Sequence, residues 1–469
     1  MSDRTSARFF EGFFDRTLRN LRSAWREIAE GARGAWARPE PAEDEAGRLR
    51  QQMRGCLDGK GGEVAARARA ADLGRTYLSL DREGRERFLR LLTEEFDLDR
   101  GAVDRCCSAL IAASGAAERW AAEKALREVL EPPRITLLRQ FNALPEGVKF
   151  LVDRRADVMD LARGELAMRR LEEDLRRLLA NWFDIGLLEL RRITWEAPAA
   201  LLEKLMAYEA VHEIRGWNDL KNRLEADRRC FAFFHPRMPD EPLIFVEVAL
   251  VKGIAGNVHA LLDEAAPVGD PESADTAIFY SISNCQRGLA GISFGDFLIK
   301  RVVAALAAEL PRLKVFATLS PVTGFRNWLD HGDAANLLLP AEQAALEAAG
   351  IGERSFADVF SRADWHQDPG IANAVREPLL RLCARYLLRE RTPSGRPLDP
   401  VAHFHLSNGA RIERLNWQGD VSARGLNQSA GIMVNYLYRL ADIEENHEAY
   451  KSEGRIAAAP AVKSLAGTL

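Results

Sequence analysis

The stretch AIFYSISNCQRGLAGISFGDFLIKRVVAALAAELPRLKVFATL, residues 277–319, decides the fold of this chain. Its two ends are short apolar runs rich in Ile, Val and Phe, and such runs predict buried strands at 277–283 and 313–319. The segment 297–310 between them has helical periodicity and ends at Pro311. A strand, a glycine-rich loop, a helix and a second strand make a βαβ unit, so the sequence predicts a parallel strand pair.

Further strand-like runs lie on both sides of this unit. Apolar runs at 230–234 and 243–251 are separated by a proline-rich turn, which predicts a hairpin-like pair. Strand-like sequence returns at 412–417 and 431–436, after a helical insertion at 325–390. No strand pattern precedes about residue 227, so this part of the chain predicts an α/β domain with one helical insertion.

The first part of the chain has helical periodicity. A helix is predicted at 79–96, and one long helix with a narrow heptad-like seam is predicted at 161–182. Such a seam is typical of a bundle core and equally of a subunit interface, and both readings stay open. The amphipathic segment 1–38 carries acidic residues and lacks the apolar region of a signal peptide, so it predicts an ordinary or partner-binding helix. The seam comprises Leu161, Met168, Leu171, Leu175, Leu178 and Trp182.

Composition excludes several classes of protein. The 469 residues are 47% hydrophobic, which is typical of a globular chain of two or three domains. A net charge of -4 argues against nucleic-acid and anionic-membrane partners, and no apolar stretch is long enough for a membrane span. The six cysteines have neither a disulfide pattern nor zinc-site spacing, which favours a reducing compartment. Arginine supplies 55 of the 65 basic residues, a bias typical of a GC-rich bacterial genome.

The glycine-rich loop at 281–295 is a candidate anion site. Gly288, Gly291 and Gly295 would let the backbone approach a ligand, and the following helix would direct its first N–H groups toward a pyrophosphate. The loop lacks the Lys-Ser/Thr of a P-loop and does not match G-x-G-x-x-G. A turn shaped by steric needs alone is the alternative interpretation.

Two short motifs downstream could carry chemistry. Ser320 follows a predicted strand directly, at the edge where open α/β sheets bind ligands, although a turn or helix cap before Pro321 is the alternative. In strand geometry His403 and His405 would share one face. Two histidines without further ligands do not make a zinc site, so a general acid/base role is more natural beside a hydroxyl. The other six histidines stand in ordinary contexts.

Long motifs in this chain resemble malonyl-CoA decarboxylases. The resemblance rests on FYSISNCQRGLAGISFGDFLIKRVV, LSPVTGFRNWL, HFHLSNGARIERLNW and SARGLNQSAGIMVNYLYRL, and extends in order from about Leu137 to Leu440. It implies a helical oligomerisation domain at 1–195 and a catalytic domain of the GNAT acetyltransferase-like fold at 196–469. It also implies decarboxylation of malonyl-CoA to acetyl-CoA and carbon dioxide without cofactor or metal, in a homotetramer acting in fatty acid metabolism.

The resemblance also assigns residues. The family's Ser-Pro serine falls on Ser320, and the histidine of its FHL-x-NGA motif falls on His405, not on His403. Ser281 and Tyr438 match positions associated with the substrate pocket in this family. Ser293 stands where some relatives have a carboxylate, which puts a role for that side chain in doubt. The acyl-CoA loop of the family falls on Ala290, Gly291, Ile292, Ser293, Phe294, Gly295 and Asp296.

The resemblance and the motifs together predict a cytoplasmic enzyme. The chain ends in Ala-Gly-Thr-Leu and so lacks the peroxisomal Ser-Lys-Leu of some relatives. We expect Ser320 to engage the departing carboxylate and His405 to protonate the α-carbon, with the order of proton transfer between them left open. An acyl-CoA-dependent acyltransferase of the same fold and a non-enzymatic acyl-CoA sensor are the alternatives.

Overall fold

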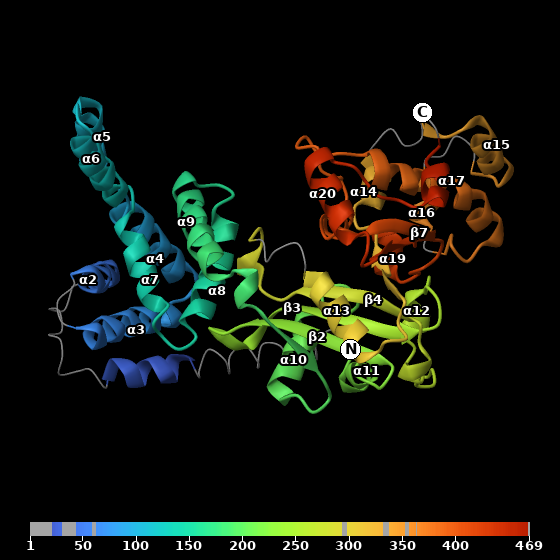
Figure 1. Cartoon of the computed structure of the whole chain (residues 1–469), viewed down its shortest axis with the longest axis horizontal. Helices are drawn as coiled ribbons and strands as arrows, with labels where there is room; N and C mark the ends of the chain where they lie inside the picture. Colours follow the sequence, from blue (N-terminus) through green and yellow to red (C-terminus); the bar gives the residue numbers. More distant parts are fainter. Residues whose placement is uncertain are drawn as a thin grey trace. The chain divides into compact units, whose positions relative to one another are not determined.

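The computed structural model describes residues 21–30, 44–58, 62–292, 298–331, 337–351, 356–362 and 364–467. The chain divides into two compact units (Figure 1). The helical unit comprises Met1–Leu188, His235–Asp240 and Gln286–Ser293, and the sheet unit comprises Glu189–Phe234, Glu241–Cys285 and Phe294–Leu469. The loop residues Ser293, Phe294, Gly295 and Asp296 lie outside the described residues. No helix among the described residues has the length and apolar character needed to cross a membrane.

The helical unit is built mainly from helices, as the sequence predicted. After a helix at 21–30 come α2 (Glu45–Leu57), α3 (Glu63–Ser79), α4 (Arg82–Glu95), α5 (Arg100–Ala112), α6 (Ala116–Val129), α7 (Pro133–Phe141), α8 (Gly147–Leu161), α9 (Leu166–Trp182) and the 3-10 turns η1 (Ile185–Leu187) and η3 (Arg287–Leu289).

An aromatic cluster forms the centre of this unit. Trp25 is completely buried, and its ring lies 5.0 Å from that of Phe150 and 6.1 Å from that of Phe141. Its indole N–H donates to the carbonyl of Pro145. Burial of rings this large supplies much of the hydrophobic driving force of a small helical unit. The described part of the predicted N-terminal helix is therefore a core element of its own unit.

The predicted long helix at 161–182 is wrong at its start. Leu161 ends α8, and α9 begins five residues later, after a turn that contains Gly164. The remaining apolar seam of α9, from Met168 to Leu178, is buried against α8 and α4. The seam is thus a bundle core within one chain, which was one of the two readings left open.

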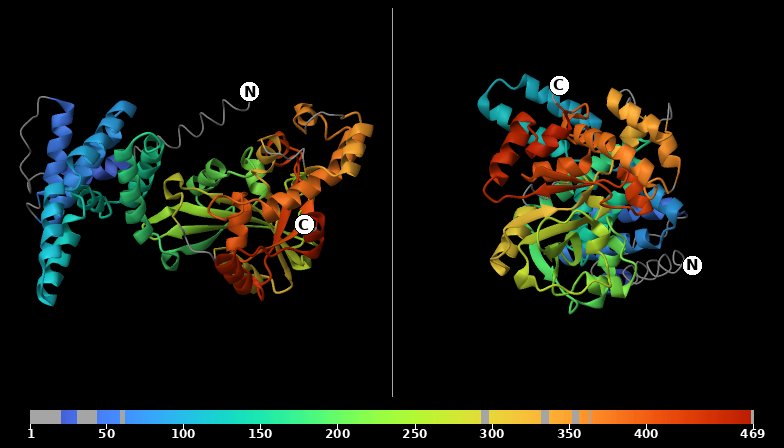
Figure 2. Two further views of the ribbon diagram at one scale, coloured as in Figure 1. Left: turned by 90° about the horizontal axis from the view of Figure 1, so that it is seen from above. Right: turned by 90° about the vertical axis from the view of Figure 1, so that its right-hand side faces the viewer.

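Helices α5 and α6 form a hairpin that projects from the other helices of its own unit (Figure 2). They pack on each other, and none of their residues is buried. Large apolar side chains are exposed here, among them Ile111 at 86% and Trp120 at 64%. Exposed apolar groups gathered on one element are typical of an interaction surface.

The first part of the glycine-rich loop belongs to the helical unit. Turn η3 packs on α8, and Arg155 of α8 donates from Nη1 to the carbonyl of Gly288 over 2.7 Å. A Cβ atom at Gly288 would lie 1.7 Å from the backbone oxygen of Val152, so only glycine permits this approach. The glycine therefore serves close packing on a helix.

The sheet unit is built on a mixed eight-stranded sheet in its described residues. The order is β1-β2-β3-β4-β5-β8-β6, with β7 paired to β8. The pair β4–β5 is parallel, as the βαβ pattern predicted, whereas β1–β2, β3–β4, β5–β8, β6–β8 and β7–β8 are antiparallel. The strands are β1 (Glu189–Ile193), β2 (Arg228–His235), β3 (Met238–Val251), β4 (Thr276–Asn284), β5 (Val315–Thr318), β6 (Ser320–Pro321), β7 (Arg411–Asn416) and β8 (Met433–Leu437).

Every strand predicted after residue 227 is present, whereas the two-residue β6 was not predicted and β1 was missed. Its sequence ELRRI carries charged residues on both faces, and only Ile193 is buried. An edge strand whose side chains mostly face solvent has no alternating apolar pattern to detect. The mixed α/β architecture behind an all-helical segment is confirmed.

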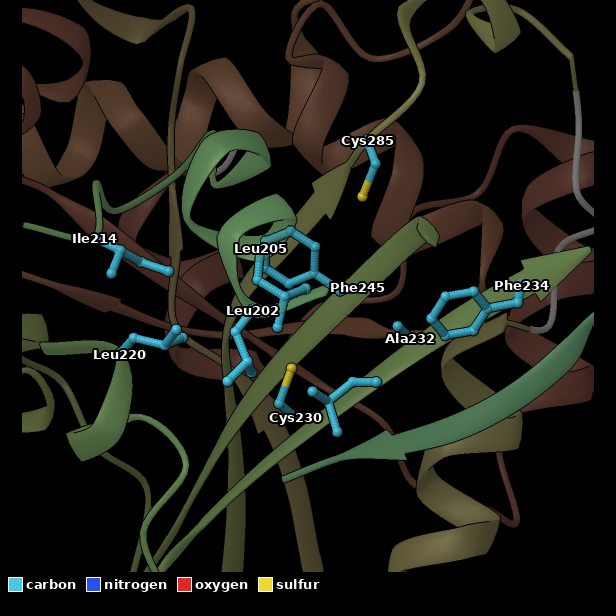
Figure 3. Close-up of a cluster of buried hydrophobic side chains, with 10 residues drawn as sticks. Leu202, Leu205, Ile214, Leu220, Cys230, Ala232, Phe234, Phe245 and Cys285 are labelled. Atoms are coloured by element: carbon cyan, nitrogen blue, oxygen red, sulfur yellow. The ribbon is translucent and has the colours of Figure 1, made fainter. Parts of the chain in front are cut away.

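Helices cover both faces of the sheet. Leu202 and Leu205 of α10 (Ala199–Tyr208) pack on Cys230, Ala232 and Phe234 of β2 (Figure 3). Phe233 points to the opposite face because side chains alternate along a strand, and there it meets Arg301 of α13 (Leu298–Glu309). The predicted helix of the βαβ unit, α13, thus covers the face of the sheet opposite to α10.

Among the described residues, four of the remaining helices lie in the predicted insertion at 325–390 and end before the prolines that were expected to stop it. A fifth helix, Pro400–Ser407, follows those prolines and precedes β7. The bounds are α11 (Trp217–Asn222), α12 (Val258–Leu261), η2 (Pro271–Ser273), α14 (Phe325–His331), α15 (Pro340–Ala348), α16 (Phe356–Ser361), α17 (Pro369–Arg389), α18 (Pro400–Ser407), α19 (Ala423–Ser429), α20 (Ile443–Glu453) and α21 (Pro460–Leu465).

We expect Gly288→Ala to destabilise the helical unit by about 1–3 kcal/mol, because the new methyl group must push η3 away from α8. Thermal unfolding measures the effect. Gly164→Ala is the matched control, because nothing lies within 4 Å of a Cβ atom at that position. Equal melting temperatures for the two variants would contradict this account of the loop.

Candidate active site

A cavity of about 290 Å³ lies in the sheet unit. Strand β4, the end of the β5–β6 stretch, helices α18 and α19 and the segment after α10 all contribute to its wall. Ser281, Ser320 and His405 line it together. Three of the predicted site residues, far apart in the sequence, thus line one cavity.

Ser320 stands where the sheet is locally interrupted. Ala317 pairs with Leu437 and Ser320 with Val434, but no ladder pair joins the strands between these positions. Side chains replace the missing bonds: Tyr436 N donates to Thr318 Oγ1 over 3.1 Å, and Asn435 Nδ2 donates to the carbonyl of Thr318 over 2.7 Å. This gap brings a buried hydroxyl to the cavity wall at a strand end, which was one of the two readings of Ser320.

His405 lies on a helix, and the predicted strand geometry for His403 and His405 is wrong. Pro400 occupies the first turn of α18, and Asp399 caps it by accepting from Ala402 N over 2.8 Å. Both are helix-start signals. Two residues apart on a helix are turned by about 200°, so the histidines point in different directions. His403 Nδ1 contacts the hydroxyl of Tyr450 at 2.6 Å, away from Ser320.

Both ring nitrogens of His405 have partners. Nε2 lies 3.2 Å from Ser320 Oγ, and Nδ1 lies 2.8 Å from the hydroxyl of Tyr438. The imidazole also stacks on the ring of Tyr436, with centroids 4.5 Å apart. Burial lowers the pKa of His405 to about 3, so the imidazole is neutral near pH 7. Tyr438 therefore reaches the site through His405, because its hydroxyl contacts the imidazole and the residue does not line the cavity.

Asp399 links the two halves of this pair. Its carboxylate accepts from Ala402 at the start of α18 and from Gly324 N, just beyond Ser320, over 3.4 Å. Burial raises the pKa of Asp399, and backbone N–H groups oppose that rise. One carboxylate thus holds the helix of His405 and the loop after Ser320 at a fixed distance. The sequence signal was the Asp-Pro pair that starts α18, which is typical of a helix cap.

Ser281 contributes to the cavity wall from β4. Its hydroxyl lies 2.8 Å from both carboxylate oxygens of Glu209, which also accepts from Ser283 Oγ and from the backbone N–H groups of Val211 and His212. The Ser281 hydroxyl therefore ties the segment after α10 to β4. Sequence reasoning missed Glu209, because nothing in the sequence pairs it with a serine 72 positions later.

His212 also lines the cavity, although its sequence context seemed ordinary. Burial lowers its pKa to about 4, and its buried Nε2 has no hydrogen-bond partner among the described residues. Arg424 lines the same side and donates from Nη1 to the carbonyl of Val211 over 3.2 Å. The cavity thus carries a neutral imidazole and a cation apart from Ser320 and His405.

Of the predicted acyl-CoA loop, the structure describes the first three residues. Ala290, Gly291 and Ile292 belong to the helical unit, and Gly291 has a positive φ of 73°. In the described part of the chain, no three His, Cys, Asp or Glu side chains are grouped as a metal site would require. All six cysteines are free.

Comparison with known proteins assigns the family. The family model of the malonyl-CoA decarboxylase C-terminal domain matches residues 186–468, and that of the N-terminal domain matches residues 96–183. The chain is 37% identical over 403 residues to the mitochondrial malonyl-CoA decarboxylase of Mus musculus, covering 81% of each chain. It is 36% identical over 421 residues to that of Anser anser anser, covering 85% of this chain and 83% of the relative.

Solved structures agree with this assignment. Crystal structures of malonyl-CoA decarboxylase from Rhodopseudomonas palustris and Agrobacterium vitis are each 42% identical to this chain, with TM-scores of 0.82 and 0.81. Each alignment covers 90% of this chain and all of the solved chain. The chain belongs to the malonyl-CoA decarboxylase family.

Proposed function

We propose that this carboxy-lyase converts malonyl-CoA to acetyl-CoA and carbon dioxide at the buried pair of Ser320 and His405. The single observation that carries the proposal is the 3.2 Å contact between Ser320 Oγ and His405 Nε2 in the wall of a cavity. This distance is within hydrogen-bond reach, which general acid/base catalysis by the imidazole requires.

The chemistry needs only groups that this site supplies. As the C–C bond to the carboxylate breaks, its electron pair moves into the thioester carbonyl and forms an enolate, so the substrate is its own electron sink. Ser320 contacts the departing carboxylate, and His405 supplies the proton that the α-carbon then takes. Burial strengthens these polar contacts by excluding water. The loop from Ala290 to Asp296 would hold the coenzyme A part of the substrate.

Incubation of the pure protein with malonyl-CoA alone tests the proposal. Carbon dioxide and acetyl-CoA should form without an added metal or organic cofactor. An acyltransferase of similar fold would need an acceptor amine and would keep the acyl group on that acceptor. Turnover that appears only with an acceptor would therefore favour the alternative.

We expect His405→Asn and Ser320→Ala each to reduce kcat by about 100- to 10,000-fold, because a positioned general acid contributes that much to the rate. The double variant should lose less than the product of the two single effects, since the residues act as one unit. Steady-state kinetics on the four proteins, with folding checked by thermal melting, measures this.

His403→Asn is the matched control, because its imidazole contacts Tyr450 rather than Ser320. It should retain kcat within a few-fold of the wild type. A severe loss in His403→Asn, or near-full turnover in Ser320→Ala, would contradict the residue assignment.

The buried neutral imidazole predicts a pH dependence of stability. The pKa of His405 is about 3 in the folded chain and about 6.5 when exposed, so the unfolded chain alone binds this proton between those values. Stability from His405 is complete above pH 6.5 and decreases as the pH falls toward 3. Between pH 7.5 and pH 5, we expect wild type to lose about 2 kcal/mol more unfolding free energy than His405→Asn. Chemical denaturation at both pH values measures this, and parallel losses would show that His405 titrates normally.

We also propose that the chain self-associates, as a tetramer, through its helical unit. The exposed apolar side chains of the α5–α6 hairpin support this site, whereas the seam of α9 is already covered within the unit. The bacterial cytoplasm is the compartment we propose. The arginine-rich composition and the six free cysteines support it.

Ile111→Glu combined with Trp120→Glu should shift the protein to a smaller species, because two charges would have to be buried in the interface. Light scattering coupled to size-exclusion chromatography measures the mass. Val64→Glu is the control, since Val64 is a single exposed apolar residue of α3 in the same unit. An unchanged mass in the double variant would exclude the hairpin as the interface.

A further inference from the structure

Four buried side chains form one row of hydrogen bonds across the site. Tyr438 contacts His405 at 2.8 Å, His405 contacts Ser320 at 3.2 Å, and Ser320 Oγ donates to Thr318 Oγ1 over 2.9 Å. Thr318 is completely buried. It forms no part of the cavity wall, so it acts on the substrate only through Ser320.

We propose that Thr318 is a positioning residue that fixes the hydrogen of His405 on Nε2 and so makes His405 the immediate proton donor to the substrate. This inference rests on the proposed function, because it assigns the order of proton transfer within the Ser320–His405 pair.

The number of available hydrogens sets the direction of each hydrogen bond in this row. A serine hydroxyl carries one hydrogen, and that of Ser320 is donated to Thr318. The contact between Ser320 Oγ and His405 Nε2 must then be donated by the imidazole. A neutral imidazole carries one N–H, so Nδ1 holds a lone pair and accepts from the hydroxyl of Tyr438. One direction of donation thus satisfies both contacts of the ring.

The local fold explains why an acceptor stands at Thr318. At the interruption between β5 and β8, Thr318 Oγ1 accepts from the backbone N–H of Tyr436 over 3.1 Å. A buried N–H left without an acceptor is costly, so this oxygen is held in place by the sheet. The ring of the same Tyr436 stacks on His405. The oxygen that orients Ser320 is therefore fixed relative to the imidazole.

The proton step balances in this direction. The Nε2–H bond of His405 breaks as the C–H bond at the α-carbon of the enolate forms. Nδ1 takes the hydroxyl proton of Tyr438 at the same time, so the imidazole remains neutral. The negative charge passes to the phenol oxygen of Tyr438. Before the next turnover Nε2, which faces the cavity, takes a proton from water, and Nδ1 returns its proton to the phenolate, which restores the starting tautomer. Ser320 keeps its own hydrogen throughout.

Thr318→Val tests the inference, since valine has the shape of threonine without its oxygen. The hydrogen of Ser320 is then free to turn to Nε2, which moves the imidazole hydrogen to Nδ1 and away from the substrate. We expect kcat to fall at least 10-fold and KM to change less than about 3-fold. Thr318→Ser keeps the oxygen and should restore most of the turnover.

The matched control is Thr276→Val. Thr276 is another completely buried strand residue of the sheet unit, and its hydroxyl bonds to Asp275 instead of the site. It should lose stability without a comparable loss of kcat. Equal kcat losses in the two valine variants would reduce Thr318 to a structural residue and overturn the inference.

Nitrogen-15 spectra of histidine-labelled protein read the tautomer directly and need no active variant. In the wild type we expect the His405 resonance, identified by its absence in His405→Asn, to show a protonated Nε2 and an unprotonated Nδ1. A protonated Nδ1 in the wild type overturns the inference even if Thr318→Val does not fold. Failure of the proposed function is distinct, because the wild type would then release no carbon dioxide from malonyl-CoA.

Discussion

The burial of one neutral imidazole is the constraint on which the active-site region depends. A histidine in a dry interior needs a partner on each ring nitrogen, because an unpaired polar atom there is costly. In this chain the partners come from two strands that do not adjoin His405 in sequence: Ser320 from β6 and Tyr438 just after β8. The helix that carries His405 can therefore take only one position relative to the sheet, and Asp399 holds it there from the helix start.

The interrupted pairing of β5 and β8 also shapes the surroundings of His405 and Ser320. A continuous ladder would have used the backbone of Thr318 and Tyr436 in ordinary strand bonds, with no side-chain oxygen between the strands. Instead the side chains of Thr318 and Asn435 take over these bonds. The sheet remains satisfied in hydrogen bonding, and a hydroxyl network opens within it at the edge where α/β sheets bind ligands. Fold stability and the orientation of Ser320 then depend on the same threonine.

Sequence reasoning succeeded where one physical signal dominated. The strands β2, β3, β4, β5 and β8 are apolar enough to be read directly, and the parallel pair β4–β5 follows from the helix between them. It failed where a local signal opposed a pattern. His403 and His405 looked like one face of a strand, although Asp399 and Pro400 before them start a helix. The Leu161–Trp182 pattern spanned a turn because heptad spacing survives a short break between two packed helices.

The site was only partly accessible from sequence for a related reason. Ser320 and His405 stand in long motifs, whereas Thr318 and Glu209 act through hydrogen bonds that only the folded chain creates. A threonine in a strand is ordinary, since its β-branched side chain suits a pleated surface. Its role becomes visible once the sheet places a hydroxyl and a backbone N–H around the same oxygen.

A neutral imidazole is a weak acid, and this choice suits the reaction. General acids are most effective when their pKa lies near the working pH, which would favour an imidazolium for most proton transfers. A thioester enolate is a far stronger base than the substrates of such acids, so it can take a proton from a neutral N–H. Burial that lowers the pKa of His405 to about 3 then has little cost in rate. It also keeps the protonation state of His405 constant from pH 5 to 8, where an exposed histidine would change charge. Burial therefore makes His405 a weaker acid, but this enolate does not need a stronger one. In return, the hydrogen bonds of the site keep one direction at every pH in that range.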